Sequence, residues 1–146
     1  MSLTPTSLLL CWIVGITDGD TLVARCPEAQ IKVRLAEIDA PEKKQPWGTA
    51  AKQALSTACY DVQAEIRPMS KDRYGRLVAH VKCHGNDASY TQVHNGMAWV
   101  YDKYAKDPSL FRLQVIAQNK RAGLWSQPDP VAPWIWRKEK RSVSER

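Results

Sequence analysis

Three strand-like segments follow one another in the first third of the chain, and this pattern constrains the fold more than any other feature. Residues 8–17 and 21–26 are rich in aliphatic side chains and flank Asp18-Gly19, a dipeptide that favours the tight turn of a β-hairpin. Residues 30–38 alternate apolar and basic side chains, so one face of this segment is apolar and the other polar. The sequence therefore predicts an antiparallel unit of three strands.

Later segments alternate between helical and strand-like patterns. The expected elements are a helix capped by Thr49 with small apolar residues over 50–58, strands over 62–67 and 77–83, and helices that begin at Asp87 and Asp107, the second ending at Gly123. A closed small barrel has no free strand edges and leaves its loops available for ligands. We therefore expect an α+β, mainly β fold: a five-stranded OB-fold barrel with about three surface helices.

The size of the chain fits one folded domain. It has 146 residues, of which 44% are hydrophobic and 25% charged, as in ordinary globular proteins. Its longest apolar run, Leu8 to Val14, is far shorter than the about 20 residues that a membrane-spanning helix needs. We expect no membrane association, an N-terminal extension at 1–10, a folded domain at 11–137 and a basic tail at 138–146.

The net charge of +6 favours anionic partners such as nucleic acid or membrane headgroups. Five basic and two acidic residues in 137–146 supply half of this charge. A basic C-terminus is in most proteins a solvated end. Charge by itself therefore does not identify the partner.

Three short motifs contain the residues that are able to carry chemistry, although each has an ordinary interpretation when taken alone. The sequence DGDT at 18–21 is typical of a hairpin turn, and DRYGR at 72–76 of a charged turn. In RLAEIDAPE at 34–42, an arginine on a strand precedes carboxylates where Pro41 forces the chain out of the sheet. Irregular backbone there is able to present a carbonyl, and carboxylate and carbonyl oxygens are ligands for Ca²⁺ or Mg²⁺ rather than zinc.

Together, these motifs resemble the staphylococcal nuclease family in order and spacing, from about Cys11 to Arg137. The likeness includes the GMAWVY and GLW segments that follow. It implies an OB-fold core and a Ca²⁺-dependent phosphodiesterase that acts on DNA and RNA, preferably single-stranded, with little sequence specificity. With the four cysteines, it also favours a secreted or periplasmic location, and we expect a monomer.

The resemblance also implies roles for individual acids. Asp20 and Asp39 are similar to the family's carboxylate ligands of Ca²⁺, and the backbone carbonyl of Ala40 is similar to a third ligand. Asp18 resembles the acid that orients the water shell of the metal. Glu42 resembles the general base that takes a proton from the attacking water.

Basic and aromatic residues complete the implied site. Arg34 and Arg76 resemble two phosphate clamps, because a guanidinium is able to give paired hydrogen bonds to phosphate oxygens as charge develops on them. Arg73 and Tyr74 are candidates for substrate binding. The three histidines lack metal-ligand spacing and are expected to be solvated or satisfied.

A second function remains open at this stage. Nuclease-like OB-fold domains also serve as non-catalytic modules that bind nucleic acid or a protein. Such modules usually lack the site acids, whereas this chain keeps Asp20, Asp39 and Glu42. The acids favour an enzyme.

The four cysteines lack the paired short spacing of a zinc site. If Asp18 and Gly19 are the central residues of the turn, the numbers of facing residues add up to 37, which is the sum for Cys11 and Cys26. The geometry predicts a disulfide between them.

Overall fold

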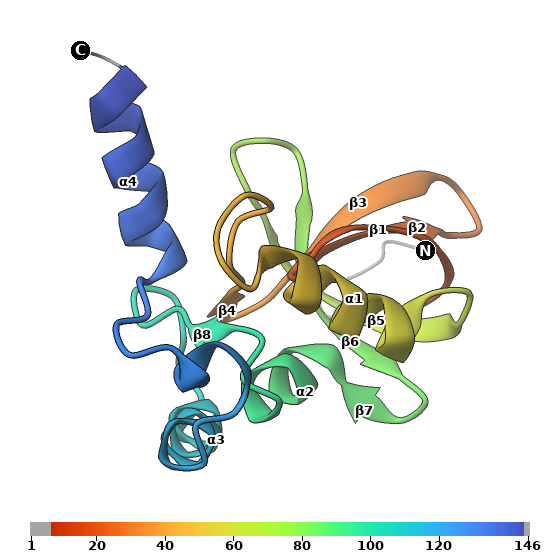
Figure 1. Ribbon diagram of the computed structural model, residues 1–146. Helices are drawn as coiled ribbons and strands as arrows, with labels where there is room; N and C mark the ends of the chain where they lie inside the picture. The colour runs from red at the N-terminus through yellow and green to blue at the C-terminus, as the bar shows by residue number, and fades with distance from the viewer. Residues whose placement is uncertain (1–6, 145–146) are drawn as a thin grey trace.

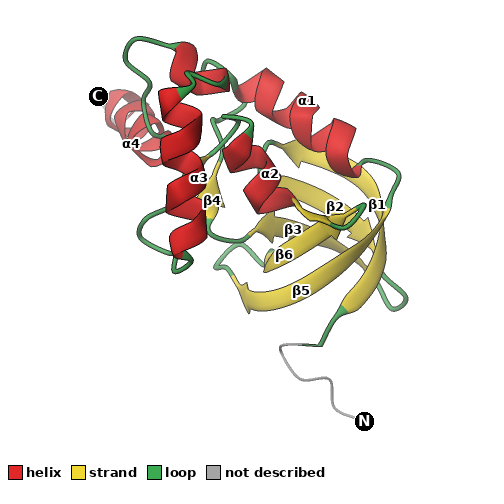
Figure 2. Ribbon diagram, turned by 90° about the horizontal axis from the view of Figure 1, so that it is seen from below, coloured by secondary structure: helices red, strands yellow, loops and turns green. Residues whose placement is uncertain are grey.

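A computed structural model describes residues 7–144, and its main feature is a closed barrel of five strands (Figure 2). The strands are β1 (Leu9–Asp18), β2 (Thr21–Arg25), β3 (Gln30–Leu35), β5 (Gln63–Lys71) and β6 (Leu77–Cys83). They lie in the order β3-β2-β1-β5-β6 with antiparallel neighbours, and a parallel pairing of β3 with β6 closes the barrel. The predicted five-stranded OB-type barrel is confirmed.

Three short strands surround the barrel. β4 (Ile38–Asp39) pairs with β8 (Trp99–Val100) in a separate two-stranded sheet, and β7 (Asn86–Asp87) pairs antiparallel with the end of β6. The pairing of β4 with β8 fixes the chain just after β3, where the RLAEIDAPE segment leaves the barrel.

Four α-helices and one short 3₁₀ helix are present within residues 7–144, most of them gathered on one side of the barrel (Figures 1 and 2). They are α1 (Gly48–Cys59), α2 (Ala88–His94), α3 (Pro108–Asn119), the 3₁₀ helix η1 (Gly123–Ser126) and α4 (Pro133–Ser144). None of the helices in this part of the chain is long and apolar enough to cross a bilayer. α4 was not anticipated, because residues 138–146 read as a tail.

The helix caps match the sequence prediction in two of four cases. Asp87 and Asp107 accept hydrogen bonds from the first backbone N–H groups of α2 and α3, as expected. Thr49 is wrong as a cap, because α1 already begins at Gly48. Gly123 is wrong as the end of α3, which stops at Asn119, since Arg121 adopts the left-handed conformation with φ of 52°.

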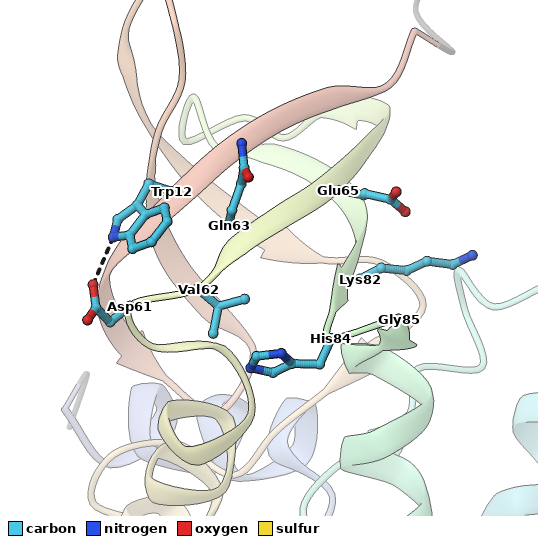
Figure 3. Close-up of a pocket in the computed structure, with 8 residues that line it drawn as sticks. All are labelled: Trp12, Asp61, Val62, Gln63, Glu65, Lys82, His84 and Gly85. Atoms are coloured by element: carbon cyan, nitrogen blue, oxygen red, sulfur yellow. Dashed lines mark hydrogen bonds between the residues drawn. The ribbon is translucent and has the colours of Figure 1, made fainter.

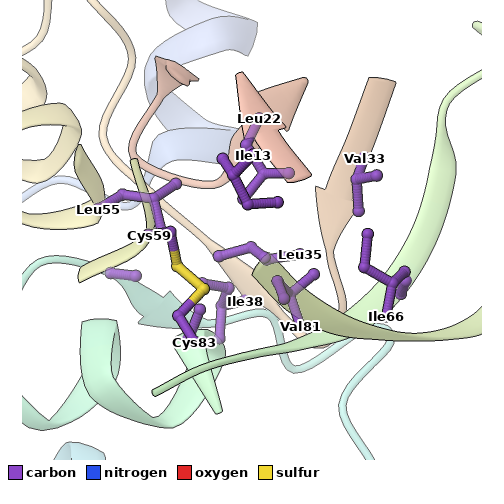
Figure 4. Close-up of a cluster of buried hydrophobic side chains, with 14 of the residues drawn as sticks. Ile13, Leu22, Val33, Leu35, Ile38, Leu55, Cys59, Ile66, Val81 and Cys83 are labelled. Atoms are coloured by element: carbon purple, nitrogen blue, oxygen red, sulfur yellow. A yellow bond between two sulfur atoms is a disulfide. The ribbon is translucent and has the colours of Figure 1, made fainter. Parts of the chain in front are cut away.

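Apolar side chains from the strands and from α1 fill the barrel (Figure 4). Ile13, Leu22, Val33 and Ile66 are fully buried and come from four different strands, and Leu55 of α1 lies against them. The alternation read in β3 and β6 therefore places one side of each strand in the core and leaves the other free for polar side chains.

The hairpin turn differs from the prediction by one residue. Asp18 ends β1, so the central residues are Gly19 and Asp20 rather than Asp18 and Gly19. A Cβ atom on Gly19 would lie only 2.6 Å from the Cβ of Ala51 and 2.8 Å from that of Ala40. Close packing of the turn against α1 and the loop after β4 therefore requires glycine here.

Two disulfides cross-link the fold. Cys11 is bonded to Cys26 as predicted, with 4.4 Å between their Cα atoms, because two irregularities in the β1–β2 register offset the one-residue error in the turn. A second disulfide, not predicted, joins Cys59 at the end of α1 to Cys83 at the end of β6. It ties the covering helix to the barrel wall.

We predict that the double substitution Cys59→Ala with Cys83→Ala lowers the free energy of unfolding by about 3 kcal/mol, because a loop of this size loses its closure constraint in the unfolded chain. Urea unfolding under non-reducing conditions measures the change, with the Cys11–Cys26 bond intact in both proteins. An unchanged midpoint and slope would contradict it.

Candidate active site

Arg34 organises the candidate site. It leaves β3 on the side opposite the core, and its side chain is only 12% exposed. Nη1 donates hydrogen bonds to the carbonyls of Leu35 (3.0 Å) and Ile38 (2.8 Å), so the chain after β3 wraps around the guanidinium. Nη2 donates to Asp39 Oδ1 at 3.2 Å, and Nη1 lies 3.5 Å from Asp20 Oδ2. One cation thus brings together two acids that are 19 positions apart in the sequence (39 minus 20).

Asp20 is buried at the centre of this group. Its Oδ2 accepts a hydrogen bond from the backbone N–H of Ala40 at 2.7 Å, and its Oδ1 accepts one from the hydroxyl of Thr21 at 2.9 Å. Burial alone would raise the pKa of Asp20, but the charge of Arg34 and these hydrogen bonds hold it below the usual range. Asp20 is therefore a carboxylate at neutral pH.

The pKa values of Asp18 and Asp39 are shifted upward, in the direction opposite to that of Asp20. Burial, followed by the negative charge of Asp20, raises the pKa of Asp18 to about 7, and Asp18 Oδ1 accepts the backbone N–H of Asp20 at 3.1 Å. Burial also raises the pKa of Asp39 to about 6, although a hydrogen bond from Arg137 opposes the shift. The acids of the site together carry more negative charge than the single positive charge of Arg34 is able to balance.

Arg137 supplies further positive charge, and sequence reasoning missed it. Its Nη2 donates to Asp39 Oδ2 at 2.8 Å, and its Nη1 donates to Asp39 Oδ1 at 3.1 Å and to Glu42 Oε1 at 2.6 Å. The hydrogen bonds to Asp39 and Glu42 outweigh the desolvation of Arg137 and raise its pKa above the usual value. A residue at the edge of the expected basic tail therefore holds two of the predicted site acids.

The tryptophans at 134 and 136 were the signal that could have indicated this contact, because large aromatic side chains in a C-terminal segment require a packing surface. Trp134 stacks on Tyr101 with ring centroids 5.0 Å apart and planes 5° from parallel. Gln45 Nε2 donates to the carbonyl of Val131 at 2.6 Å. These contacts place α4 beside the loop that carries Glu42.

Arg76 approaches the acids from the start of β6. Its Nε donates to Asp72 Oδ2 at 2.7 Å, and its Nη1 donates to the Thr21 hydroxyl at 3.4 Å. Since that hydroxyl donates in turn to Asp20, the side chain of Thr21 connects Arg76 to Asp20 at the centre of the site. The barrel closure between β3 and β6 brings the two predicted arginines to the same end.

Arg73 and Tyr74 lie further out, on the exposed β5–β6 turn. Arg73 Nη2 donates to the Tyr74 hydroxyl at 2.8 Å, and the guanidinium groups of Arg73 and Arg76 lie 5.0 and 5.7 Å from the centre of the Tyr74 ring. The structure therefore joins the acids, Ala40 and Arg34 in one hydrogen-bonded group and leaves Arg73 and Tyr74 at its margin.

A surface pocket elsewhere contains none of these residues (Figure 3). It lies over β1, β5 and β6, where the Trp12 indole donates to Asp61 at 2.8 Å. The candidate site is thus defined by its charged groups and not by the pocket.

The donor atoms at the candidate site suit a hard cation. Asp20 and Asp39 offer carboxylate oxygens, and the chain at Ala40 lies against Asp20. Within residues 7–144, no three His, Cys, Asp or Glu side chains form a metal-binding cluster. A cation here would have the carboxylates of Asp20 and Asp39, and the Ala40 carbonyl is the third ligand that the family resemblance implies; such an oxygen set would fit Ca²⁺.

Comparisons with known proteins agree with this geometry. The family described as "Staphylococcal nuclease homologue" matches residues 32–127, which is more than half of the chain. The chain belongs to this family. It is 41% identical over 132 residues to an "Uncharacterized endonuclease" of Haemophilus influenzae, covering 90% of this chain and 74% of that protein. It is 40% identical to "Protein ParB" of Escherichia coli and 34% identical to "Micrococcal nuclease" of Shigella flexneri, covering 78% and 82% of those proteins and 87% and 90% of this one.

In this member of the staphylococcal nuclease family, Arg137 contacts the site acids although it lies beyond the matched segment, which ends at residue 127.

We predict that Arg137→Gln increases hydrogen exchange of the backbone amides of α4 about fivefold, because a half-exposed charged contact contributes about 1 kcal/mol. Mass spectrometry of peptides from 133–144 measures the exchange. Arg141→Gln, the same change one helical turn further on, serves as the control and should leave the exchange unchanged.

His80 holds the segment between Arg34 and Asp39 from another direction. Its Nε2 lies 2.8 Å from Glu37 Oε2, and its Nδ1 lies 2.9 Å from Asp87 Oδ2. Glu37 Oε1 also accepts the backbone N–H groups of Lys106 and Asp107, at the start of α3. The expectation of a satisfied histidine is confirmed, and His80 joins β6, α2 and the site loop.

Hydrogen bonding to Asp87 and the charges of both acids outweigh burial and raise the pKa of His80 above 6.5. The protonated ring donates to both acids, whereas the neutral ring donates to only one. The stabilisation is therefore fully present below the unfolded pKa of about 6.5 and is lost as the pH rises through the higher folded pKa.

We predict that the stability advantage of the wild type over His80→Gln declines as the pH rises above about 6.5, since the variant lacks this titration. Urea unfolding of both proteins at each pH gives the difference, and the shared site acids cancel. A difference that is constant or grows with pH would contradict the assignment.

Proposed function

We propose that this protein is a Ca²⁺-dependent phosphodiesterase that hydrolyses DNA and RNA, preferably single-stranded, with little sequence specificity. The observation that supports this most is the bridging of Asp20 and Asp39 by Arg34, with Glu42 and Arg76 at the same end of the barrel. Membership of the staphylococcal nuclease family, and relatives named as an endonuclease and a micrococcal nuclease, agree with it.

Each residue has a chemical task in the proposed reaction. Arg34 and Arg76 bind the scissile phosphate and stabilise the negative charge that builds up on its oxygens. Glu42 accepts a proton from the attacking water; one of its oxygens, Oε2, receives no hydrogen bond from residues 7–144 and is free for this. Asp18 supports Asp20 through the Asp20 backbone N–H.

Ca²⁺ would be held by Asp20, Asp39 and the carbonyl of Ala40, and when bound it supplies positive charge that neutralises a phosphate oxygen and acidifies water. A secreted or periplasmic location is part of the proposal, supported by two disulfides, which persist in oxidising compartments. We also propose that the protein acts as a monomer.

We predict that Glu42→Gln lowers the hydrolysis rate of denatured DNA and of RNA about 100-fold or more, which is the usual contribution of a general base. The assay is run with Ca²⁺, with Mg²⁺ and with chelator. We expect turnover with Ca²⁺, markedly less with Mg²⁺, whose geometry is stricter, and none with chelator.

Glu65→Gln is the matched control, because Glu65 is an exposed acid on β5. Full activity in chelator would reject the metal-dependent mechanism. Nucleic acid binding without hydrolysis, in wild-type protein with Ca²⁺, would favour the non-catalytic binding module instead. Near-normal turnover by folded Glu42→Gln would remove Glu42 as the base.

A further inference from the structure

α4 carries its positive charges mainly along one face. Its second turn contains Arg137, Lys138, Lys140 and Arg141 and a single acid, Glu139. Successive residues of an α-helix are rotated by about 100°, so Lys140 and Arg141 share the face of Arg137 while Glu139 lies on the opposite side. The sequence and the helix geometry together define a basic stripe, formed by Arg137, Lys140 and Arg141.

This stripe begins at the candidate site. Arg137 contacts both Asp39 and Glu42, so the face that it shares with Lys140 and Arg141 starts beside the acids. A helix rises about 1.5 Å per residue, which places Arg141 about 6 Å further along the axis than Arg137. Figure 1 shows α4 pointing away from the barrel, with its first turn nearest β4 and β8.

The outer part of the stripe is available for a partner. Lys140 and Arg141 are exposed, and neither forms an ion pair with any residue of 7–144, whereas Arg34, Arg76 and Arg137 are all paired with acids. Lys140 Nζ lies 4.6 Å from the centre of the Trp136 ring, which keeps its stem against the helix. Two cations beside the candidate site therefore have no acidic partner among the described residues.

The helix is already held in place. The Trp134–Tyr101 stack and the Arg137 contacts fix its first half, and the Gln45–Val131 hydrogen bond fixes the chain just before it. A ligand that binds the stripe would therefore not have to order the helix, which removes much of the entropic cost of binding. This distinguishes α4 from a solvated, unattached tail.

We propose that α4 is a nucleic-acid-binding arm, along which the sugar-phosphate backbone of the substrate runs beyond the scissile phosphate. The inference rests on the proposed function, in which Arg34 and Arg76 bind the scissile phosphate, because Arg34 and Arg137 both contact Asp39 and the stripe therefore begins beside that phosphate. The strand is a polyanion with a negative charge at every nucleotide, and Lys140 and Arg141 continue from the site in the direction that such a strand is able to follow. Contacts of this kind carry no sequence information, in agreement with low specificity.

The test is the salt dependence of binding to a fluorescein-labelled single-stranded DNA of 16 nucleotides, measured by anisotropy with the full chain in chelator so that no cleavage occurs. Each phosphate contact to a single strand contributes about 0.7 to the slope of log K against log salt. We expect the double variant Lys140→Gln with Arg141→Gln to lower the magnitude of the slope by about 1.4.

The matched control is Arg25→Gln with Lys82→Gln, which also removes one arginine and one lysine. Both residues are exposed and lie away from the site, Arg25 at the far end of β2 from Thr21 and Lys82 near the far end of β6 from Arg76. We expect the control to keep the wild-type slope. Equal slopes in the arm variant and the wild type, or an equal loss in both double variants, would overturn the arm.

Vesicles containing phosphatidylglycerol distinguish nucleic acid from an anionic lipid surface. Vesicle binding that depends on Lys140 and Arg141, together with unchanged DNA binding, would overturn the proposal in favour of a lipid contact. If the wild type hydrolyses DNA but the slope is insensitive to the arm, only the arm is wrong. If the wild type neither binds nor hydrolyses nucleic acid with Ca²⁺, the proposed function is wrong, and the arm with it.

Discussion

The partly buried guanidinium of Arg34 is the interaction on which the arrangement of the site depends. It neutralises Asp20 and Asp39 while donating to two backbone carbonyls of the chain that leaves β3. A charge removed from water is tolerated only when it is paired and its hydrogen bonds are made, and Arg34 meets both conditions. The chain after β3 is thereby forced into the irregular path that presents Asp39, Ala40 and Glu42 together.

Several elements support that path from outside the barrel. Glu37, in the left-handed conformation with φ of 69°, is held by His80 and by the backbone at the start of α3. β4 pairs with β8, and the turn at Gly19 packs against Ala40. Such convergence is the way in which a fold maintains a strained segment, because each contact restricts the same few backbone angles.

The C-terminal segment contributes directly to the candidate site. The match to the staphylococcal nuclease family ends at residue 127, yet Arg137 binds two site acids and Trp134 stacks on Tyr101. The candidate site is therefore built from both the barrel and α4. Relatives that lack an equivalent of Arg137 would have to balance the charges of Asp39 and Glu42 in another way.

The sequence predicted the barrel, and it singled out Asp20, Arg34 and Asp39, which the structure brings together. The alternation of apolar and polar residues in the strands, the turn residues and the caps Asp87 and Asp107 are local patterns, and each indicates its structure from a few neighbouring residues alone. Arg137, the Cys59–Cys83 disulfide and the role of His80 were decided only by the tertiary structure. Each depends on where two elements distant in sequence meet, and side-chain periodicity holds no information about that meeting. The negative charges of Asp39 and Glu42 require a nearby cation, and only the packing of α4 shows that this cation is Arg137.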